Sequence, residues 1–177
     1  SDTTKKRSIL DLGTGSGCLL LALLSEFPNA NGTGVDRSDA ALEVAERNAK
    51  ALKLDHRASF VNGNWADAIK DQYEIVISNP PYIPSDEIQN LDADVALFEP
   101  MSALDGGADG LDSYRIIVAQ IHRVMAEEAY IFLETGTGQA PAVADMIEAS
   151  GMQVIDIKKD LSGIERCVVG ATNFPDD

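Results

Sequence analysis

The stretch SILDLGTGSGCLLLALL, residues 8–24, decides the fold of this chain. Its first five residues form a short apolar run typical of a buried strand, and its last seven form an apolar run typical of a helix. Between them stand Gly13, Gly15 and Gly17 in a G-x-G-x-G spacing. These glycines let the backbone turn tightly and approach a ligand closely. A strand, a glycine-rich turn and a helix in this order indicate a nucleotide-binding, Rossmann-like sheet.

The details of this turn separate the possible nucleotide ligands. A dinucleotide fingerprint would place its third glycine at position 18, where this chain has Cys18, and the chain contains no G-x-x-x-x-G-K-[ST] sequence of a P-loop. Asp11 stands just before the first glycine, and its carboxylate would repel a pyrophosphate. It suits instead a ligand that carries an ammonium group and a sulfonium.

A second carboxylate ends the next predicted strand, which covers residues 31–36 and closes on Asp36. An acid at this point of a Rossmann-like sheet normally binds ribose hydroxyl groups. A simpler alternative stays open, in which Asp36 or Asp39 only caps the helix that begins near Ser38.

Asn79-Pro80-Pro81-Tyr82 follows another strand-like apolar run, residues 73–78. Two adjacent prolines neither continue a strand nor start a normal helix, so the chain must turn stiffly at the carboxyl end of the strand. Open α/β sheets bind ligands at this edge. The Asn79 side chain and the Pro80 carbonyl can accept hydrogen bonds from the two N–H groups of a planar NH2 group, while the Tyr82 ring stacks on its plane. The alternative is a plain turn that ends a strand.

Strands and helices alternate along nearly the whole chain, which predicts an α/β fold with a mostly parallel sheet and helices on both faces. Only residues 160–164 separate the last two strands, which should therefore form an antiparallel hairpin at the end of a seven-stranded sheet. Strands are predicted at about residues 7–12, 31–36, 57–62, 73–78, 129–134, 152–158 and 165–171. Helices are predicted at about residues 17–26, 38–52, 112–125 and 139–150, with a short one near 65–70.

Residues 79–111 show little periodicity, and a segment this long without regular structure favours a functional loop. We expect it to be a substrate loop, with a short helix around Ser85–Leu97. Glu99 is a candidate for orienting the loop or the substrate.

The composition indicates a single soluble domain. The chain has 177 residues, of which 45% are apolar and 6% aromatic, and it has no run of about 18 apolar residues that could span a membrane. We expect one domain over residues 1–177, no membrane association, a cytoplasmic location and a monomer. Cys18 and Cys167 lack the spacing of metal ligands, so we expect reduced, buried thiols and no metal site.

The charge of the chain argues against a nucleic-acid substrate. The net charge is −15, and residues 79–112 contain eight acidic side chains but no lysine or arginine. A phosphate backbone would be repelled from such a segment, whereas a protein with a basic surface would be attracted to it.

Together these motifs resemble the class I S-adenosylmethionine-dependent methyltransferases and, within them, the peptide chain release factor glutamine methyltransferases (HemK/PrmC type). The resemblance runs from Ile9 to Gly170. The stretches that carry it are residues 11–18, 78–83, 98–100 with 103–104, 106–111 ahead of 114–115, Glu134 with Gln139, and 160–163.

The resemblance implies methyl transfer from S-adenosylmethionine, with S-adenosylhomocysteine as product, to the side-chain amide nitrogen (N5) of a protein glutamine. The implied substrate is the Gly-Gly-Gln motif of a release factor. The expected catalytic residues are Asn79, Pro80, Pro81 and Tyr82. The glycine turn would face the methionine and ribose end of the cofactor, with Asp36 at the ribose and Asn64 and Trp65 at the adenine. The residues expected to bind the cofactor are Asp11, Gly13, Thr14, Gly15, Gly17, Asp36, Asn64, Trp65 and Asn79.

The chain departs from the family pattern in three places. Asn64 stands where the family usually has an acid, and residues 126–129 replace a Pro-Gly-Gly turn. The resemblance also implies an amino-terminal helical domain that helps to grip the release factor, and we expect this chain to be the excised catalytic domain or a standalone relative without it. We expect cofactor binding to survive this absence and substrate methylation to become less efficient. Trp65 fits ordinary core packing nearly as well as cofactor contact.

Two other functions stay open at the level of sequence. The Asn79–Tyr82 tetrapeptide would also serve an N-methyltransferase that acts on an exocyclic amino group of a base in RNA or DNA. The domain could also be a non-catalytic S-adenosylmethionine-binding module that activates a partner.

Overall fold

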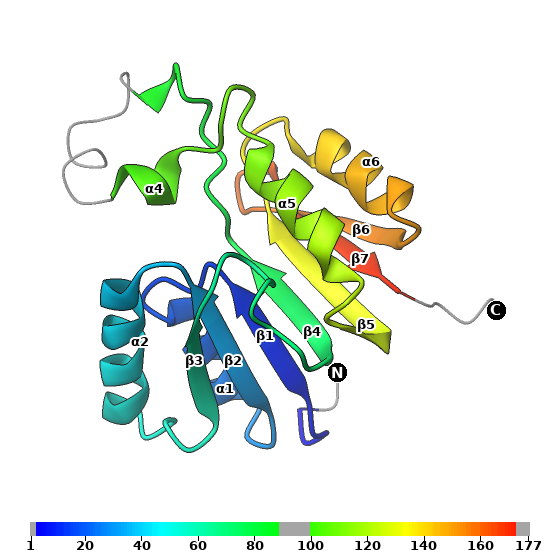
Figure 1. The fold of residues 1–177 in the computed structure, drawn as a ribbon. Helices are drawn as coiled ribbons and strands as arrows, with labels where there is room; N and C mark the ends of the chain where they lie inside the picture. The colour runs from blue at the N-terminus through cyan, green and yellow to red at the C-terminus, as the bar shows by residue number, and fades with distance from the viewer. Residues whose placement is uncertain (1–2, 89–99, 173–177) are drawn as a thin grey trace.

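The computed structural model describes residues 3–88 and 100–172, which form a seven-stranded sheet covered by helices on both faces (Figure 1). The strands are β1 (Ser8–Leu12), β2 (Asn31–Asp36), β3 (Ala58–Asn62), β4 (Tyr73–Ser78), β5 (Met125–Glu134), β6 (Gln153–Lys159) and β7 (Glu165–Ala171). The helices are α1 (Cys18–Glu26), α2 (Asp39–Ala51), α4 (Met101–Leu104), α5 (Asp112–Ile121) and α6 (Ala140–Ala149).

The strand order is β3-β2-β1-β4-β5-β7-β6. The first five strands pair in parallel, and β7 is antiparallel to both β5 and β6. The α/β fold with a carboxyl-terminal hairpin is therefore confirmed. The chain builds outward from β1 in one direction through β2 and β3, then crosses to the other side of β1 with β4. This reversal opens a crevice at the carboxyl ends of β1 and β4, where sheets of this type bind ligands.

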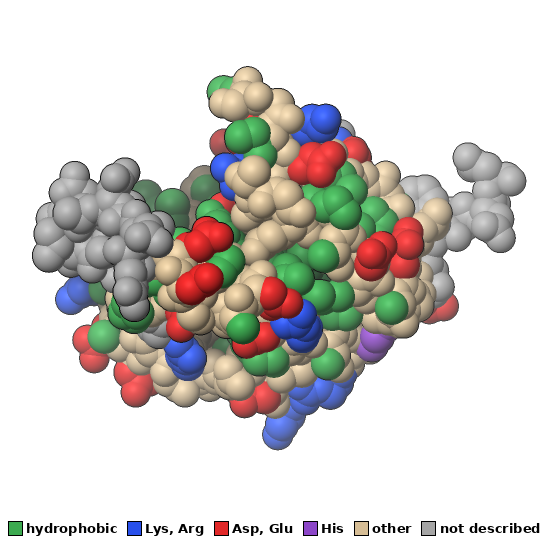
Figure 2. Space-filling model, turned by 90° about the horizontal axis from the view of Figure 1, so that it is seen from above, with side chains coloured by type: hydrophobic (Ala, Val, Ile, Leu, Met, Phe, Trp, Pro, Cys, Tyr) green, Lys and Arg blue, Asp and Glu red, His purple; other side chains and the backbone are tan. Residues whose placement is uncertain are grey.

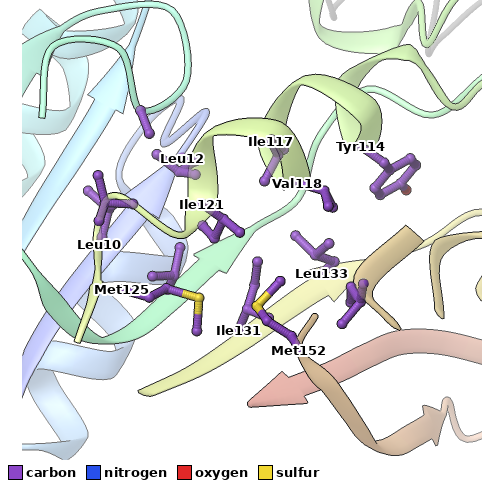
Figure 3. Packing of buried hydrophobic residues seen from close by; sticks show 14 of the residues in the cluster. Leu10, Leu12, Tyr114, Ile117, Val118, Ile121, Met125, Ile131, Leu133 and Met152 are labelled. Atoms are coloured by element: carbon purple, nitrogen blue, oxygen red, sulfur yellow. The ribbon is translucent and has the colours of Figure 1, made fainter. Parts of the chain in front are cut away.

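Alternation along β1 divides the core into two layers. Ile9 packs on one face with α1 and the end of α2, in a cluster that contains Leu20 and Leu24. Leu10 and Leu12 point to the other face, where α5 and α6 cover the sheet (Figure 3). Because all of these side chains are fully buried, the two layers hold the carboxyl edge of the sheet rigidly.

The boundary between α5 and β5 differs from the prediction. The helix ends at Ile121 rather than at 125, and the strand begins at Met125 rather than at 129. The apolar spacing of Ile121, Val124 and Met125 continues the helical pattern, so the sequence does not mark the helix end. In the structure the Val124 carbonyl accepts the Tyr73 N–H at 2.8 Å and Met125 pairs with Tyr73, which draws the chain into the sheet.

Two short segments also correct the prediction. Residues 65–68 form turns instead of a helix, because Trp65 has a left-handed φ of 58° that a helix does not allow. The helix α4 lies inside the stretch that was expected to be irregular. Most of the short helix expected at Ser85–Leu97 lies outside the described residues.

The thiols differ from expectation as well. Cys18 is exposed and Cys167 is half-buried, so neither is the buried thiol that the sequence indicated. Across residues 3–88 and 100–172, helices that combine the length and apolarity needed to cross a bilayer are absent.

Candidate functional site

A cavity of about 700 Å³ opens at the carboxyl edge of the sheet. Segments that are far apart in the sequence meet there: the turn after β1, the end of β2, the turn after β3 and the segment after β4. A volume of this order is typical of small-molecule sites. Of the residues that the sequence pointed to, those that line the cavity are Gly13, Gly15, Asp36, Asn64, Trp65, Asn79 and Pro81.

The glycine turn is held against β2. The N–H groups of Gly13 and Thr14 both donate to the Val35 carbonyl, at 2.8 and 2.9 Å. Gly13 has a φ of 72°, and a Cβ at this position would lie 3.2 Å from a ring carbon of Trp65. The glycine therefore allows both the left-handed turn and the close approach of the indole ring.

Asp36 is anchored by two backbone groups. One carboxylate oxygen accepts the Gly15 N–H and the other accepts the Ser38 N–H, each at 2.9 Å. The cap of α2 is Ser38, whose hydroxyl accepts the Ala41 N–H. Ser38 therefore caps α2, and the alternative in which Asp36 only caps this helix is wrong. Each carboxylate oxygen of Asp36 keeps a further lone pair for a ligand in the cavity.

Trp65 both packs on the core and lines the cavity, so the core packing is confirmed and its contact with the cofactor stays a prediction. Its turn is fastened from α5 and the residues just after it. The Gln120 side chain accepts the Ala66 N–H at 2.8 Å, and the Arg123 guanidinium donates to the Ala66 carbonyl at 2.6 Å. No local sequence pattern predicts these supports, because Gln120 and Arg123 lie more than fifty residues away from the turn. The exposed Asn64 precedes Trp65 at the cavity wall.

The tetrapeptide begins at a strand end that is tied to β1. The buried Ser78 hydroxyl donates to the Leu12 carbonyl at 2.6 Å. Asn79 is exposed to the cavity, and within the described part of the chain its side-chain amide has no hydrogen-bond partner. Among the described residues, none therefore competes with a ligand for this amide. Pro80 is buried, and the half-buried Tyr82 packs against the core beneath α5 and α6. Neither lines the cavity, so their contacts with a substrate stay predictions.

The segment after the tetrapeptide pairs with the loop that leads into α5. Ile83 forms a parallel bridge with Asp105. The Ile83 N–H donates to the Leu104 carbonyl at 3.0 Å, and the Gly106 N–H donates to the Ile83 carbonyl at 2.9 Å. Pro100, Asp105 and Gly107 thereby reach the cavity wall. Glu99 lies outside the described residues.

Carboxylates dominate the charged wall of the cavity. Asp36, Asp105 and Asp112 line it together with Arg37. Seen from above, this face carries acidic side chains with basic ones between them (Figure 2). Such a wall favours a cationic ligand or a basic protein surface over a polyphosphate.

Comparison with known proteins places this geometry in a family. Residues 1–101, which contain the glycine turn and the tetrapeptide, match the family model described as "Methyltransferase small domain". The chain belongs to the methyltransferase small domain family. The strand order and the cavity at the edge of β1 and β4 agree with this membership.

Curated relatives of this methyltransferase domain carry the name "Release factor glutamine methyltransferase". The protein from Rhodospirillum rubrum is 53% identical over 161 residues, covering 91% of this chain and 50% of the relative. The protein from Caulobacter vibrioides is 44% identical over 167 residues, covering 94% and 58%. The chain thus spans about half the length of the curated relatives it matches.

Solved structures share the fold. A methyltransferase from Pyrococcus furiosus superposes with a TM-score of 0.74 at 15% identity, covering 97% of this chain and 78% of that one. A SAM-dependent methyltransferase from Aquifex aeolicus gives 0.69 at 13% identity, covering 97% and 85%. At these identities the likeness concerns the fold alone.

Asp11 and Thr14 lie beneath the turn of the methyltransferase domain rather than in the cavity wall. Asp11 is 1% exposed and accepts a hydrogen bond from the Thr14 hydroxyl at 2.7 Å. Burial raises the pKa of the Asp11 carboxyl to about 6, and the bond from Thr14 opposes this shift. Gly17 is also absent from the wall; it has a φ of 78° and precedes the first residue of α1. The contact of Asp11, Thr14 and Gly17 with the cofactor therefore stays a prediction.

The pKa of Asp11 predicts how its charge affects stability. The carboxyl titrates near 3.8 when unfolded and near 6 when folded, so its ionisation destabilises the fold. This penalty is absent below 3.8, grows as the pH rises through about 6 and then stays constant. Two pKa units correspond to about 3 kcal/mol. About half of this penalty is already present at pH 5, so from pH 5 to pH 8 we expect the free energy of unfolding of Asp11→Asn to increase relative to that of the native protein by about 1.4 kcal/mol.

Urea denaturation at both pH values measures this difference, and any pH-independent cost of altered hydrogen bonds cancels in it. The exposed Asp71 provides the matched control as Asp71→Asn. If the difference in free energy of unfolding between Asp11→Asn and the native protein does not change with pH, the prediction is contradicted.

Proposed function

We propose that this methyltransferase domain transfers a methyl group from S-adenosylmethionine to the side-chain amide nitrogen (N5) of a protein glutamine, in the Gly-Gly-Gln motif of a peptide chain release factor. The observation that carries the proposal is the position of Asn79, whose exposed side chain lines the same cavity as Gly13 and Asp36. The names of the curated relatives support the choice of substrate.

The cavity has the features that the cofactor requires. Asp36 presents acceptors for the ribose hydroxyls, and Trp65 presents an aromatic surface for the adenine. A Cβ at Gly15 would meet no atom within 4 Å, so the turn leaves open space for the rest of the molecule. Asn64 can accept or donate a hydrogen bond at the adenine. S-adenosylmethionine supplies a methyl group that its sulfonium makes electrophilic.

The tetrapeptide acts on the glutamine amide. The Asn79 side-chain oxygen and the Pro80 carbonyl accept hydrogen bonds from its two N–H groups. These bonds fix the nitrogen and oppose the delocalisation that makes amides poor nucleophiles. Tyr82 packs against the amide plane. The main catalytic effect is positioning, with the nitrogen held about 3–3.5 Å from the methyl carbon. The nitrogen forms a bond to the methyl carbon as the methyl–sulfur bond breaks, S-adenosylhomocysteine leaves with the electron pair of that bond on its sulfur, and the nitrogen releases one proton to water.

The acidic wall supports a protein substrate over a nucleic acid. Asp105 and Asp112 line the same cavity as Asn79, and they attract a basic protein surface while they repel phosphates. Because the proposed substrate acts in translation, the proposal includes a cytoplasmic location for the reaction.

The test is transfer of labelled methyl groups from S-adenosylmethionine to a purified release factor, beside a factor whose Gly-Gly-Gln glutamine is replaced. Calorimetry measures cofactor binding in parallel. Label on the native factor that is lost on the substituted factor supports the proposal. Labelling of RNA or DNA instead would establish the nucleic-acid alternative. Cofactor binding without label on any of these substrates would indicate the non-catalytic module.

A further inference from the structure

Gln139 joins three segments around the tetrapeptide. Its side-chain NH2 donates to the Tyr82 carbonyl at 2.8 Å and to the Gly110 carbonyl at 3.3 Å. Its side-chain oxygen accepts the Gly136 N–H at 3.0 Å. One half-buried amide thus connects the segment after β4, the loop before α5 and the turn after β5. We refer to these three hydrogen bonds as the Gln139 clamp.

The Gln139 clamp is packed too tightly to be incidental. A Cβ at Gly110 would lie 2.3 Å from the Tyr82 oxygen and 2.5 Å from the Gln139 side-chain nitrogen. A Cβ at Gly136 would lie 2.8 Å from the Gln139 side-chain oxygen and 3.0 Å from the Tyr82 ring. Since side chains essentially never approach this closely, both positions require glycine for the clamp to form.

Gln139 makes this clamp instead of capping its own helix. It occupies the N-cap position of α6, yet its side chain makes no capping hydrogen bond. The side chain turns back toward the site, away from the free N–H groups that an N-cap residue usually satisfies. Its polar atoms therefore serve the loops and not the helix.

The tetrapeptide needs such a support because it can make few backbone bonds. Pro80 and Pro81 have no N–H to donate. Before them, the Ser78 hydroxyl at the end of β4 donates to the Leu12 carbonyl of β1, and after them Gln139 donates to the Tyr82 carbonyl. The two prolines form a stiff connection between these anchors, so the position of the second anchor determines where the Asn79 oxygen and the Pro80 carbonyl point.

From this geometry we infer that Gln139 is a positioning residue for methyl transfer, which sets the acceptor geometry of the Asn79–Tyr82 tetrapeptide through the Tyr82 carbonyl. This inference rests on the proposed function for its chemistry, and on the hydrogen bonds alone for its structure. Gln139 itself does not line the cavity.

Substitutions at Gln139 separate hydrogen bonding from packing. Gln139→Glu keeps the shape and the acceptor for Gly136, but a carboxylate cannot donate to the carbonyls of Tyr82 and Gly110 and repels them. Gln139→Met keeps the volume without any donor. Gln153→Glu is the matched control, because Gln153 is exposed on β6 and pairs with Ala171 far from the carboxyl edge.

The first measurement is hydrogen exchange of the protein without substrate. We expect faster exchange of the backbone amides of Ile83 and Ser85 in both Gln139→Glu and Gln139→Met, with no change in β1 or α2. The Gly136 amide should exchange faster only in Gln139→Met, which lacks the acceptor. The native protein and Gln153→Glu should exchange alike. Unchanged exchange around the clamp in both Gln139 variants would overturn the inference, whatever the substrate of the enzyme is.

The second measurement is methyl transfer to the release factor. A small displacement of a positioned group lowers the rate steeply, so we expect kcat to fall about 10- to 100-fold in both variants while the dissociation constant of S-adenosylmethionine changes less than about twofold. Native kcat in Gln139→Glu would overturn the inference. If the native protein does not label the factor, the proposed function fails, and hydrogen exchange still decides the clamp.

Discussion

Replacing Asn79 with alanine is expected to lower kcat for methyl transfer about 100- to 1,000-fold, the range found when one group that stabilises a reacting atom is removed. The substitution removes one of the two acceptors for the amide protons, so the nitrogen loses both its orientation and its electronic activation. The fold should be unaffected, because the exposed Asn79 side chain has no partner within the described part of the chain. The dissociation constant of S-adenosylmethionine should change by no more than about threefold, less than one hydrogen bond is worth.

Steady-state kinetics with the release factor, together with calorimetry of cofactor binding, measure the two quantities separately. Asn31→Ala is the matched control, since Asn31 is also exposed but stands at the amino end of β2, on the opposite edge of the sheet. A variant Asn79→Ala with near-native kcat would remove the tetrapeptide from the mechanism. If Asn79→Ala instead weakens cofactor binding as strongly as it lowers kcat, Asn79 acts by binding the cofactor and not by positioning the amide.

Replacing Asp36 with alanine is expected to have the largest effect on the cofactor. A hydrogen bond to a charged group contributes about 1.5–3 kcal/mol, so the loss of the ribose contacts should raise the dissociation constant of S-adenosylmethionine about 100-fold or more. The carboxylate also holds the N–H groups of Gly15 and Ser38. Asp36→Asn keeps one carbonyl oxygen and should lose less affinity than Asp36→Ala.

The single tryptophan of the chain offers a direct readout, because Trp65 lines the same cavity. Titration of its fluorescence with S-adenosylmethionine gives the dissociation constant without any methyl acceptor. Asp39→Ala is the control, since Asp39 begins α2 and does not line the cavity. Its carboxylate accepts a hydrogen bond from the Asn62 side-chain amide. Equal affinities of Asp36→Ala and the native protein would refute the ribose assignment.

The two substitutions test different halves of one cavity. Asp36 should act on cofactor affinity, and Asn79 should act on the rate once the cofactor is bound. Gln139 should resemble Asn79 in its kinetics although it does not line the cavity. This pattern follows from the hydrogen bond that Gln139 donates to the Tyr82 carbonyl.

The sequence by itself determined the features that depend on local chemistry. Glycine spacing and apolar runs predicted the turn between β1 and α1, because positive φ angles and strand alternation are properties of neighbouring residues. Two prolines after the β4 run predicted a stiff turn at the ligand-binding edge for the same reason. The short connection at residues 160–164 predicted the antiparallel pairing of β6 and β7, which the structure confirms.

Only the tertiary structure decided the features that depend on distant partners. It gave the helix cap to Ser38 and left Asp36 in the cavity wall, and it buried Asp11 beneath the turn. It also brought the Gln139 side chain within hydrogen-bond distance of the carbonyl of Tyr82, which lies 57 positions away in the sequence. No local pattern specifies such contacts, because a side chain's hydrogen-bond partners are set by how the layers pack rather than by its neighbours in the chain.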